Sequence, residues 1–134
     1  MAAVAVWRAY GVDELLNELW RKGVILTGWS AGAVCWFAAS LTASLVTDQL
    51  EPYHDGLGII PDSACPHFNG TERRDAFARC VAAGTLPPGF GFDEGSIGHF
   101  VGPELAQVLS TNGIHSVHHV TPDGISRVAA DPWP

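Results

Sequence analysis

The chain has 134 residues, a length that predicts a single domain spanning residues 1–134. Its formal net charge is −7, and Glu72-Arg73-Arg74 is its only dense basic cluster, so no nucleic-acid partner is expected. No apolar run approaches the roughly 18 residues of a membrane-spanning helix. The charged N-terminal segment lacks the pattern of a secretory signal, so we expect a cytoplasmic protein without a membrane partner.

The first part of the chain predicts a helix, a buried strand and a second helix. Residues 3–21 repeat apolar side chains at helical spacing, and Lys22-Gly23 is a typical helix end. The run VILTG at 24–28 is short, apolar and rich in β-branched residues, as in a buried parallel strand. Residues 31–41 are apolar all round, which predicts a buried helix. This order of elements is typical of an α/β fold.

The second part predicts one helix followed by several short strands. Residues 42–66 look irregular apart from a short strand at 56–60. Residues 71–84 predict a helix that Thr71 caps and Gly84 ends. Five later runs are joined by Gly, Asn-Gly and Asp-Gly turns and predict strands at 89–95, 96–102, 106–110, 115–121 and 124–130.

A lone serine stands between two glycines directly after the first predicted strand. Gly28-Trp29-Ser30-Ala31-Gly32 matches the pattern G-x-S-x-G. In that pattern a sharp strand-to-helix turn displays the serine hydroxyl, and small neighbours let strand and helix approach closely. The predicted strand and helix supply the context that the pattern requires. The sequence therefore predicts a nucleophile elbow at Ser30.

A nucleophilic serine needs a base, and His67 is the candidate. It lies in the irregular segment Ser-Ala-Cys-Pro-His-Phe-Asn-Gly after a short predicted strand, and loops at sheet edges are where catalytic groups collect. His115, His118 and His119 lie in a late predicted strand and are interpreted as surface or hydrogen-bonded residues. Strand alternation separates the last two, so they predict no metal site. His54 and His99 stay undecided.

The three cysteines predict neither a disulfide framework nor a zinc site. Cys35, Cys65 and Cys80 contain no CxxC pair, and their number is odd. We interpret them as buried, reduced thiols. No metal and no cofactor are expected.

Two stretches together resemble a known family. GVILTGWSAGAVCWF at 23–37, followed by GLGIIPDSACPHFNGTERR at 56–74, resembles the peptidase E family, the aspartyl dipeptidases of peptidase family S51. The resemblance covers nearly the whole chain and implies a class-I glutamine-amidotransferase-like (flavodoxin-like) α/β fold, a parallel sheet with flanking helices and short C-terminal strands. It implies serine-type hydrolysis of small peptides, dipeptides with an N-terminal aspartate. It also implies a chain that is shortened at its N-terminus.

The resemblance assigns roles to several residues. Ser30 is then the nucleophile, His67 the general base and the Ala31 N–H an oxyanion donor. The third member of the triad is open, because Ala43 stands where some relatives carry an aspartate. Asp48 is the favoured acid, and the alternatives are Glu51, Glu94 or no functional acid at all.

Substrate contacts follow from the same resemblance. Arg73 and Arg74 have the forked donors that suit the carboxylate of an aspartate substrate. Glu94, beside Asp93, suits a substrate ammonium group or the support of His67. The family strands that are expected to be missing would expose a sheet edge through which two copies of the chain could pair.

Two other functions fit parts of the sequence. A shortened, catalytically impaired family member could act as a ligand- or partner-binding domain. An α/β-hydrolase esterase uses the same serine turn, but its acid and histidine come much later in a longer chain.

Overall fold

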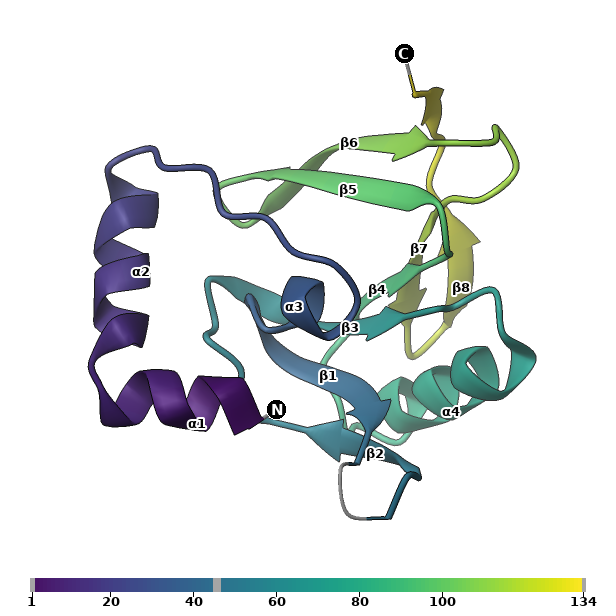
Figure 1. Ribbon diagram of the computed structural model, residues 1–134. Helices are drawn as coiled ribbons and strands as arrows, with labels where there is room; N and C mark the ends of the chain where they lie inside the picture. The colour runs from purple at the N-terminus through teal and green to yellow at the C-terminus, as the bar shows by residue number, and fades with distance from the viewer. Residues whose placement is uncertain (1, 45–46, 134) are drawn as a thin grey trace.

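The computed structural model describes residues 2–44 and 47–133, and a six-stranded sheet forms its centre (Figure 1). Its strands are β1 (Phe37–Ala43), β2 (Leu50–Tyr53), β3 (Ile60–Pro66), β4 (Gly89–Phe92), β7 (Val117–Thr121) and β8 (Gly124–Arg127), in the order β2-β1-β3-β4-β7-β8. The pairs β1–β3 and β3–β4 are parallel, whereas β2, β7 and β8 join antiparallel to their neighbours. The α/β class is confirmed, with a mixed sheet rather than a purely parallel one.

Different elements cover the two faces of this sheet. Helix α4 (Thr71–Ala82) packs on one face, and the single turn α3 (Ala31–Val34) lies on the other (Figure 1). A small second sheet, in the order β5-β6-β9, adds to the α3 side; it consists of β5 (Ser96–Val101), β6 (Glu104–Ser110) and β9 (Asp131–Pro132). Helices α1 (Ala2–Ala9) and α2 (Val12–Arg21) form an L beside these layers.

The core is divided by the sheet into two clusters. On the α4 side, Phe68 and Phe77 are fully buried and meet edge to face, with ring centroids 6.1 Å apart. On the α3 side, Phe37 packs edge to face against Phe92 and Phe100. Burial of large aromatic side chains on both faces holds β1, β3 and β4 in place, and these are the strands that lead into the site described below.

The helix expected at 3–21 is two helices. Gly11 adopts φ 68°, a left-handed conformation that glycine reaches without a steric penalty, and it separates α1 from α2. Helix α1 contacts the sheet layers through Val4, which is 1% exposed, and through Trp7, which stacks on Trp36 with a centroid distance of 6.4 Å.

The strand expected at 24–28 is not formed. Val24 and Ile25 are 45% and 85% exposed, and the N–H groups of residues 25–28 form no hydrogen bond with other described residues. A strand exists only where a neighbouring strand takes up its backbone groups. Within residues 2–44 and 47–133 no strand runs beside this segment, so the apolar run stays an extended, exposed connection to Ser30.

The buried helix expected at 31–41 is also wrong beyond its first turn. Only Ala31–Val34 is helical, and the chain then enters β1. Strand β1 lies inside the sheet with both faces covered, and Phe37, Ala39 and Leu41 are at most 4% exposed. A strand that is buried on both faces is apolar all round, as a buried helix is, so the pattern did not separate the two.

The later elements agree better with expectation. The segment 42–66 contains β2 and β3 and the end of β1, so it is more regular than predicted, and β3 starts at Ile60 rather than at residue 56. Helix α4 is confirmed, but Gly70 rather than Thr71 is its N-cap. Gly84, with φ 70°, follows its C-terminus as expected. Strands β4 to β8 confirm the five predicted runs within a few residues.

Candidate active site

Ser30 has the backbone conformation of a residue displayed on a sharp turn. Its φ and ψ are 50° and −119°, and it directly precedes α3. A non-glycine residue with positive φ is uncommon and marks local strain. A Cβ added at Gly28 would lie 1.9 Å from the carbonyl oxygen of Gly32, so the turn requires a glycine there. A Cβ at Gly32 would meet nothing within 4 Å, so only the first glycine of the motif is sterically required.

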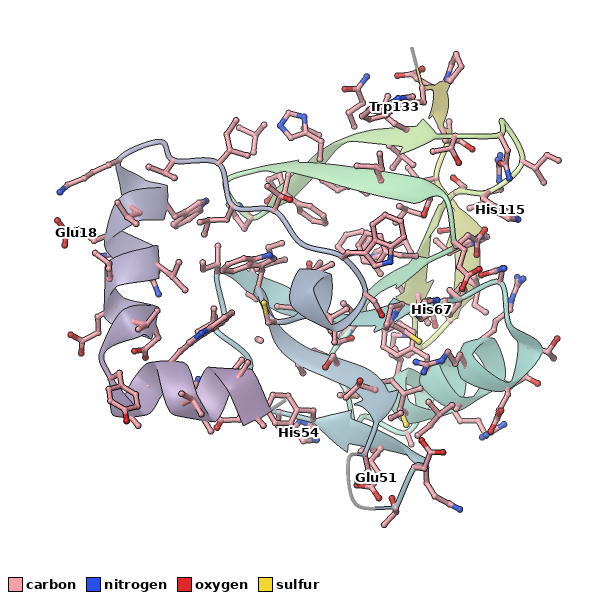
Figure 2. The ribbon with its side chains drawn as sticks, viewed as in Figure 1. Glu18, Glu51, His54, His67, His115 and Trp133 are labelled. Carbon is pink, nitrogen blue, oxygen red and sulfur yellow. The ribbon has the colours of Figure 1, made fainter. Side chains whose placement is uncertain are left out.

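His67 reaches Ser30 from the end of β3. The strand ends at Pro66, and His67 turns the chain with φ 56°. Its Nε2 lies 2.8 Å from Ser30 Oγ. Figure 2 shows His67 between α3 and α4, beyond the end of β3. The serine and the histidine that the sequence proposed as a pair are therefore within hydrogen-bond distance.

Glu94 contacts the other nitrogen of the same ring. It follows β4, and its Oε1 lies 2.6 Å from His67 Nδ1. An ionised carboxylate only accepts hydrogen bonds, so Nδ1 carries the proton and donates a hydrogen bond to Glu94. In the neutral imidazole Nε2 is then the acceptor, and it accepts from the Ser30 hydroxyl. The three side chains form one line of hydrogen bonds with the polarity of a Ser-His-acid triad.

The line of hydrogen bonds is open to solvent at its acidic end. The side chain of His67 is 36% exposed and that of Glu94 is 63% exposed. A substrate can therefore approach the ring and the hydroxyl. The attraction between Glu94 and a charged His67 is weaker than it would be between buried partners, because water screens it.

The two other candidates for the acid do not contact His67. Asp48 lies exposed in the connection between β1 and β2, and Glu51 accepts a hydrogen bond from Thr47 Oγ1 at 2.7 Å. Figure 2 shows Glu51 on β2, well away from His67. The structure thus brings Glu94 into contact with His67, and it does not bring Asp48, the favoured choice, to that histidine. The reason is topological: β1 continues into the antiparallel β2 at an edge of the sheet, whereas β4 runs parallel to β3 and ends beside it.

Ala31, the residue after Ser30, offers a free backbone donor. Its N–H forms no hydrogen bond with other described residues, whereas the N–H groups of Gly32, Ala33 and Val34 bond to the carbonyls of Trp29 and Ser30. A free N–H next to Ser30 can stabilise an oxyanion that forms on a carbon attached to Ser30 Oγ. This geometry agrees with the role that the sequence proposed for Ala31.

The two arginines proposed for the substrate lie in the first turn of α4, and neither has a contact to Ser30 or His67 among the described residues. The Nη1 atom of Arg73 is buried and unpartnered within that part of the chain, so this side chain points inward. Arg74 is exposed, and its Cζ lies 5.6 Å from the centre of the Phe68 ring. Arg74 is the better placed of the two for a ligand.

The buried cysteines do not compete with Ser30 as nucleophiles. Burial raises the pKa of the Cys35 thiol to about 11, and a hydrogen bond from the backbone N–H of Cys35 itself lowers it only in part. Burial raises the pKa of Cys65 to about 12, against a smaller opposing effect of Arg73. The reactive form of cysteine is the thiolate, so both residues are inert near neutral pH.

A buried hydrogen-bonded pair that the sequence did not reveal, Asp93 and His118, lies behind the site. Asp93, directly before Glu94, accepts hydrogen bonds from His118 Nε2 at 3.0 Å and from the Ser116 N–H at 3.1 Å. The side chains of Asp93 and His118 are 10% and 9% exposed. His118 is thus a hydrogen-bonded core residue, one of the two interpretations given for it. Strand alternation puts His118 and His119 on opposite faces of β7, but the sequence alone does not say which of the two faces is buried.

Other kinds of site have little support. The residues that the structure describes contain no group of three or more histidine, cysteine or acidic side chains arranged to hold a metal ion. No helix within 2–44 and 47–133 combines the length and the apolar character needed to span a bilayer.

Known proteins are similar to this chain in sequence. The profile of peptidase family S51 matches residues 3–108. Over 111 residues the chain is 35% identical to "Uncharacterized peptidase YgaJ" of Bacillus subtilis (strain 168). That alignment covers 81% of this chain and 46% of the relative, so the chain spans about half the length of the curated relative that it matches. No solved structure matches. With most of its residues inside the family profile, the chain belongs to peptidase family S51.

Proposed function

We propose that the chain is a serine-type peptidase that acts through Ser30, His67 and Glu94. The single observation that carries the proposal is the line of hydrogen bonds from Ser30 Oγ to His67 Nε2 and from His67 Nδ1 to Glu94 Oε1. Membership of a peptidase family supports the same conclusion. Hydroxyl, imidazole and carboxylate in this order are the arrangement that makes a serine nucleophilic.

The geometry suits an acyl-enzyme mechanism. Ser30 Oγ attacks the peptide carbonyl carbon while His67 Nε2 takes its proton, and the carbonyl oxygen becomes an oxyanion near the Ala31 N–H. His67 then gives the proton to the leaving amine, the C–N bond breaks and an ester on Ser30 remains. Water attacks that ester, His67 again takes and returns the proton, and the carboxylic acid leaves. Glu94 keeps the ring in the required tautomer and stabilises its charged form throughout.

The Ala31 N–H is the one donor that we propose for the oxyanion site. An oxyanion donor is worth about 2.7–4 kcal/mol of transition-state stabilisation, so the Ala31 N–H alone supports a substantial rate. A substrate that brings its carbonyl oxygen to this N–H also brings its carbon to Ser30 Oγ, because the two groups belong to adjacent residues.

The substrates proposed are small peptides, with dipeptides that begin with aspartate as the first class to test. This specificity comes from the family resemblance. Arg74 supports it as an exposed cation on α4 that can attract a side-chain carboxylate. Arg73 supports it less, because its Nη1 is buried. A cytoplasmic location and pairing between copies of the chain stay predictions of the sequence.

The proposal is tested by hydrolysis of an aspartyl chromogenic amide. The purified chain is compared with Ser30→Ala, after circular dichroism has established that both are folded. Hydrolysis that needs Ser30 is the expected result. Equal rates from the two folded proteins would reject a peptidase that acts through Ser30.

A second candidate is a domain that binds a ligand or partner without turning it over. The exposed segment 24–28, whose N–H groups from residue 25 onward have no partner among the described residues, favours it as a surface that another strand could cover. A folded chain that binds aspartyl peptides in calorimetry, yet hydrolyses them no faster than Ser30→Ala, would establish this alternative.

A further inference from the structure

We propose that Asn69 is a positioning residue that holds Glu94 against His67. The inference rests on the proposed function, since it concerns the same line of hydrogen bonds. The observation that carries it is one contact: Asn69 Oδ1 accepts a hydrogen bond from the backbone N–H of Glu94 at 3.1 Å. Asn69 itself touches neither Ser30 nor the His67 ring among its hydrogen bonds to described residues.

The hydrogen bond from the Glu94 N–H to Asn69 lies just beyond the end of the β3–β4 pairing and takes the place of a backbone hydrogen bond there. Strands β3 and β4 pair in parallel as far as Pro66 and Phe92, and the N–H of Phe68 still donates to the Phe92 carbonyl at 2.9 Å. His67, with φ 56°, then turns the chain away from the strand direction. The N–H of Glu94 lies beyond the last pair, and the side-chain oxygen of Asn69 supplies the acceptor that the backbone no longer offers.

Glu94 needs such a support because little else fixes its carboxylate. The side chain is 63% exposed, and the hydrogen bond to His67 is the contact that the structure gives its oxygens. A long, exposed side chain loses conformational entropy when it is held in one rotamer. The direction of its Cα–Cβ bond therefore decides how often the carboxylate meets Nδ1, and that direction is set by the backbone on either side of Glu94.

The rest of that backbone is already anchored. Asp93 exchanges hydrogen bonds with Ser116 in both directions, through its backbone N–H and through its carboxylate, and it pairs with His118. The carbonyl oxygen of Glu94 contacts His115 Nδ1. Asn69 thus holds the N–H of a residue whose other neighbours are fixed, and it comes from the same segment as His67. Its hydrogen bond therefore fixes the backbone of Glu94 relative to the segment that carries His67.

The test uses two measured quantities, and substitution of a residue with a merely structural role would not change both of them. The first is the second-order rate of Ser30 labelling by a fluorophosphonate, which needs no knowledge of the natural substrate. The second is the tautomer of the neutral His67 ring, read from its ¹⁵N shifts in the full chain. Asn69→Ala removes the acceptor, Asn69→Leu removes it while keeping the volume, and Asn17→Ala on α2 is the matched control.

The expected results follow from a role that acts through Glu94. Asn69→Ala and Asn69→Leu slow labelling about tenfold, as the loss of one net hydrogen bond does, and move the ring away from the Nδ1–H tautomer. In a Glu94→Gln background, Asn69→Ala slows labelling no further. Asn17→Ala matches the unmodified chain in both readouts, and a thermal melt verifies that each variant is folded.

Each contrary result has a separate meaning. Two results would overturn the role of Asn69 while leaving the triad standing. One is a folded Asn69→Ala variant with the labelling rate and the tautomer of the unmodified chain. The other is a loss of labelling rate from Asn69→Ala that is as large in the Glu94→Gln background as in the unmodified chain. If the unmodified chain shows no labelling that depends on Ser30, the proposed function fails, and the tautomer shift alone decides whether Asn69 positions Glu94.

Discussion

Glu94 Oε1 lies 2.6 Å from His67 Nδ1, although 27 positions of sequence separate the two residues. Each comes just after one of two neighbouring parallel strands, β3 and β4, whose last paired residues are Pro66 and Phe92. The carboxyl ends of parallel strands meet at one edge of a sheet, which is where α/β proteins place their ligands. The fold thus brings His67 and Glu94 together through strand pairing rather than through a local motif.

Replacing Glu94 by glutamine should reduce turnover strongly. The amide can donate to Nδ1 and so favours the wrong tautomer, a change that costs about 10⁴-fold in a buried triad. Because Glu94 is 63% exposed, we expect a smaller loss of roughly 10³-fold in kcat, measured on an aspartyl chromogenic amide. Asp48→Asn is the matched control and should keep the full rate. A larger loss in Asp48→Asn than in Glu94→Gln would show that the acid is assigned wrongly.

The two glycines of the serine turn should respond differently to alanine. In Gly28→Ala the new Cβ meets backbone atoms of Gly32 and Ala33 within 2.7 Å, so the turn must shift. We expect a loss of about 1–3 kcal/mol in the free energy of unfolding. Gly32→Ala meets nothing within 4 Å and lies in α3, so its stability should stay within about 0.5–1 kcal/mol or rise. Urea unfolding of both variants decides; equal effects would contradict this account of the turn.

Truncating His118 should destabilise the fold from behind the site. His118→Ala removes a hydrogen-bond partner from the carboxylate of Asp93, only 10% exposed, and it removes a ring whose centroid lies 5.3 Å from that of Phe68. A buried acceptor that loses a hydrogen-bond partner costs about 1–3 kcal/mol, read from urea unfolding. His99→Ala, at an exposed position, should change stability by less than about 0.5 kcal/mol. If both variants behave alike, the Asp93–His118 pair does not stabilise the fold.

The buried thiols predict a fall of stability at alkaline pH. Burial raises the pKa of Cys65 from 9.0 to about 12 in the folded chain, and that of Cys35 from 9.0 to about 11. Above pH 9 the unfolded chain releases these protons first, so the unfolded state is favoured and the free energy of unfolding falls as pH rises toward 12. In urea titrations between pH 8 and pH 10.5, Cys65→Ala should show a shallower fall than the unmodified chain. Identical slopes would mean that Cys65 is not protected in the folded state.

The sequence predicted those parts of the fold whose signals are local. Helix α4 has a clear apolar stripe and a glycine after its end, and strands β4 to β8 are separated by turn residues. The segment 31–41 was misassigned because an apolar run carries no period that distinguishes a buried strand from a helix. The segment 24–28 was misassigned because no described strand runs beside it. Whether such a run forms a strand depends on a neighbour elsewhere in the chain, which the run itself does not encode.

The candidate site was predictable in part for the same reason. Ser30 and His67 each stand in a recognisable local pattern, and the structure places them 2.8 Å apart. The acid has no such pattern, and distance along the sequence favoured Asp48. The useful signal was topological: an acid just after the strand next to that of His67 lies at the same edge. Glu94 meets that condition, and Asp48 does not.

Covalent labelling of Ser30 tests the central claim most directly. The purified chain, His67→Ala and Ser30→Ala are incubated with a fluorophosphonate, and the modified residue is located by peptide mass spectrometry after each protein has been shown to be folded. We expect one adduct, on Ser30, in the unmodified chain, and no adduct at that residue in the two variants. A folded, unmodified chain that gains no adduct on Ser30, or gains it equally in His67→Ala, would contradict an activated serine at this turn.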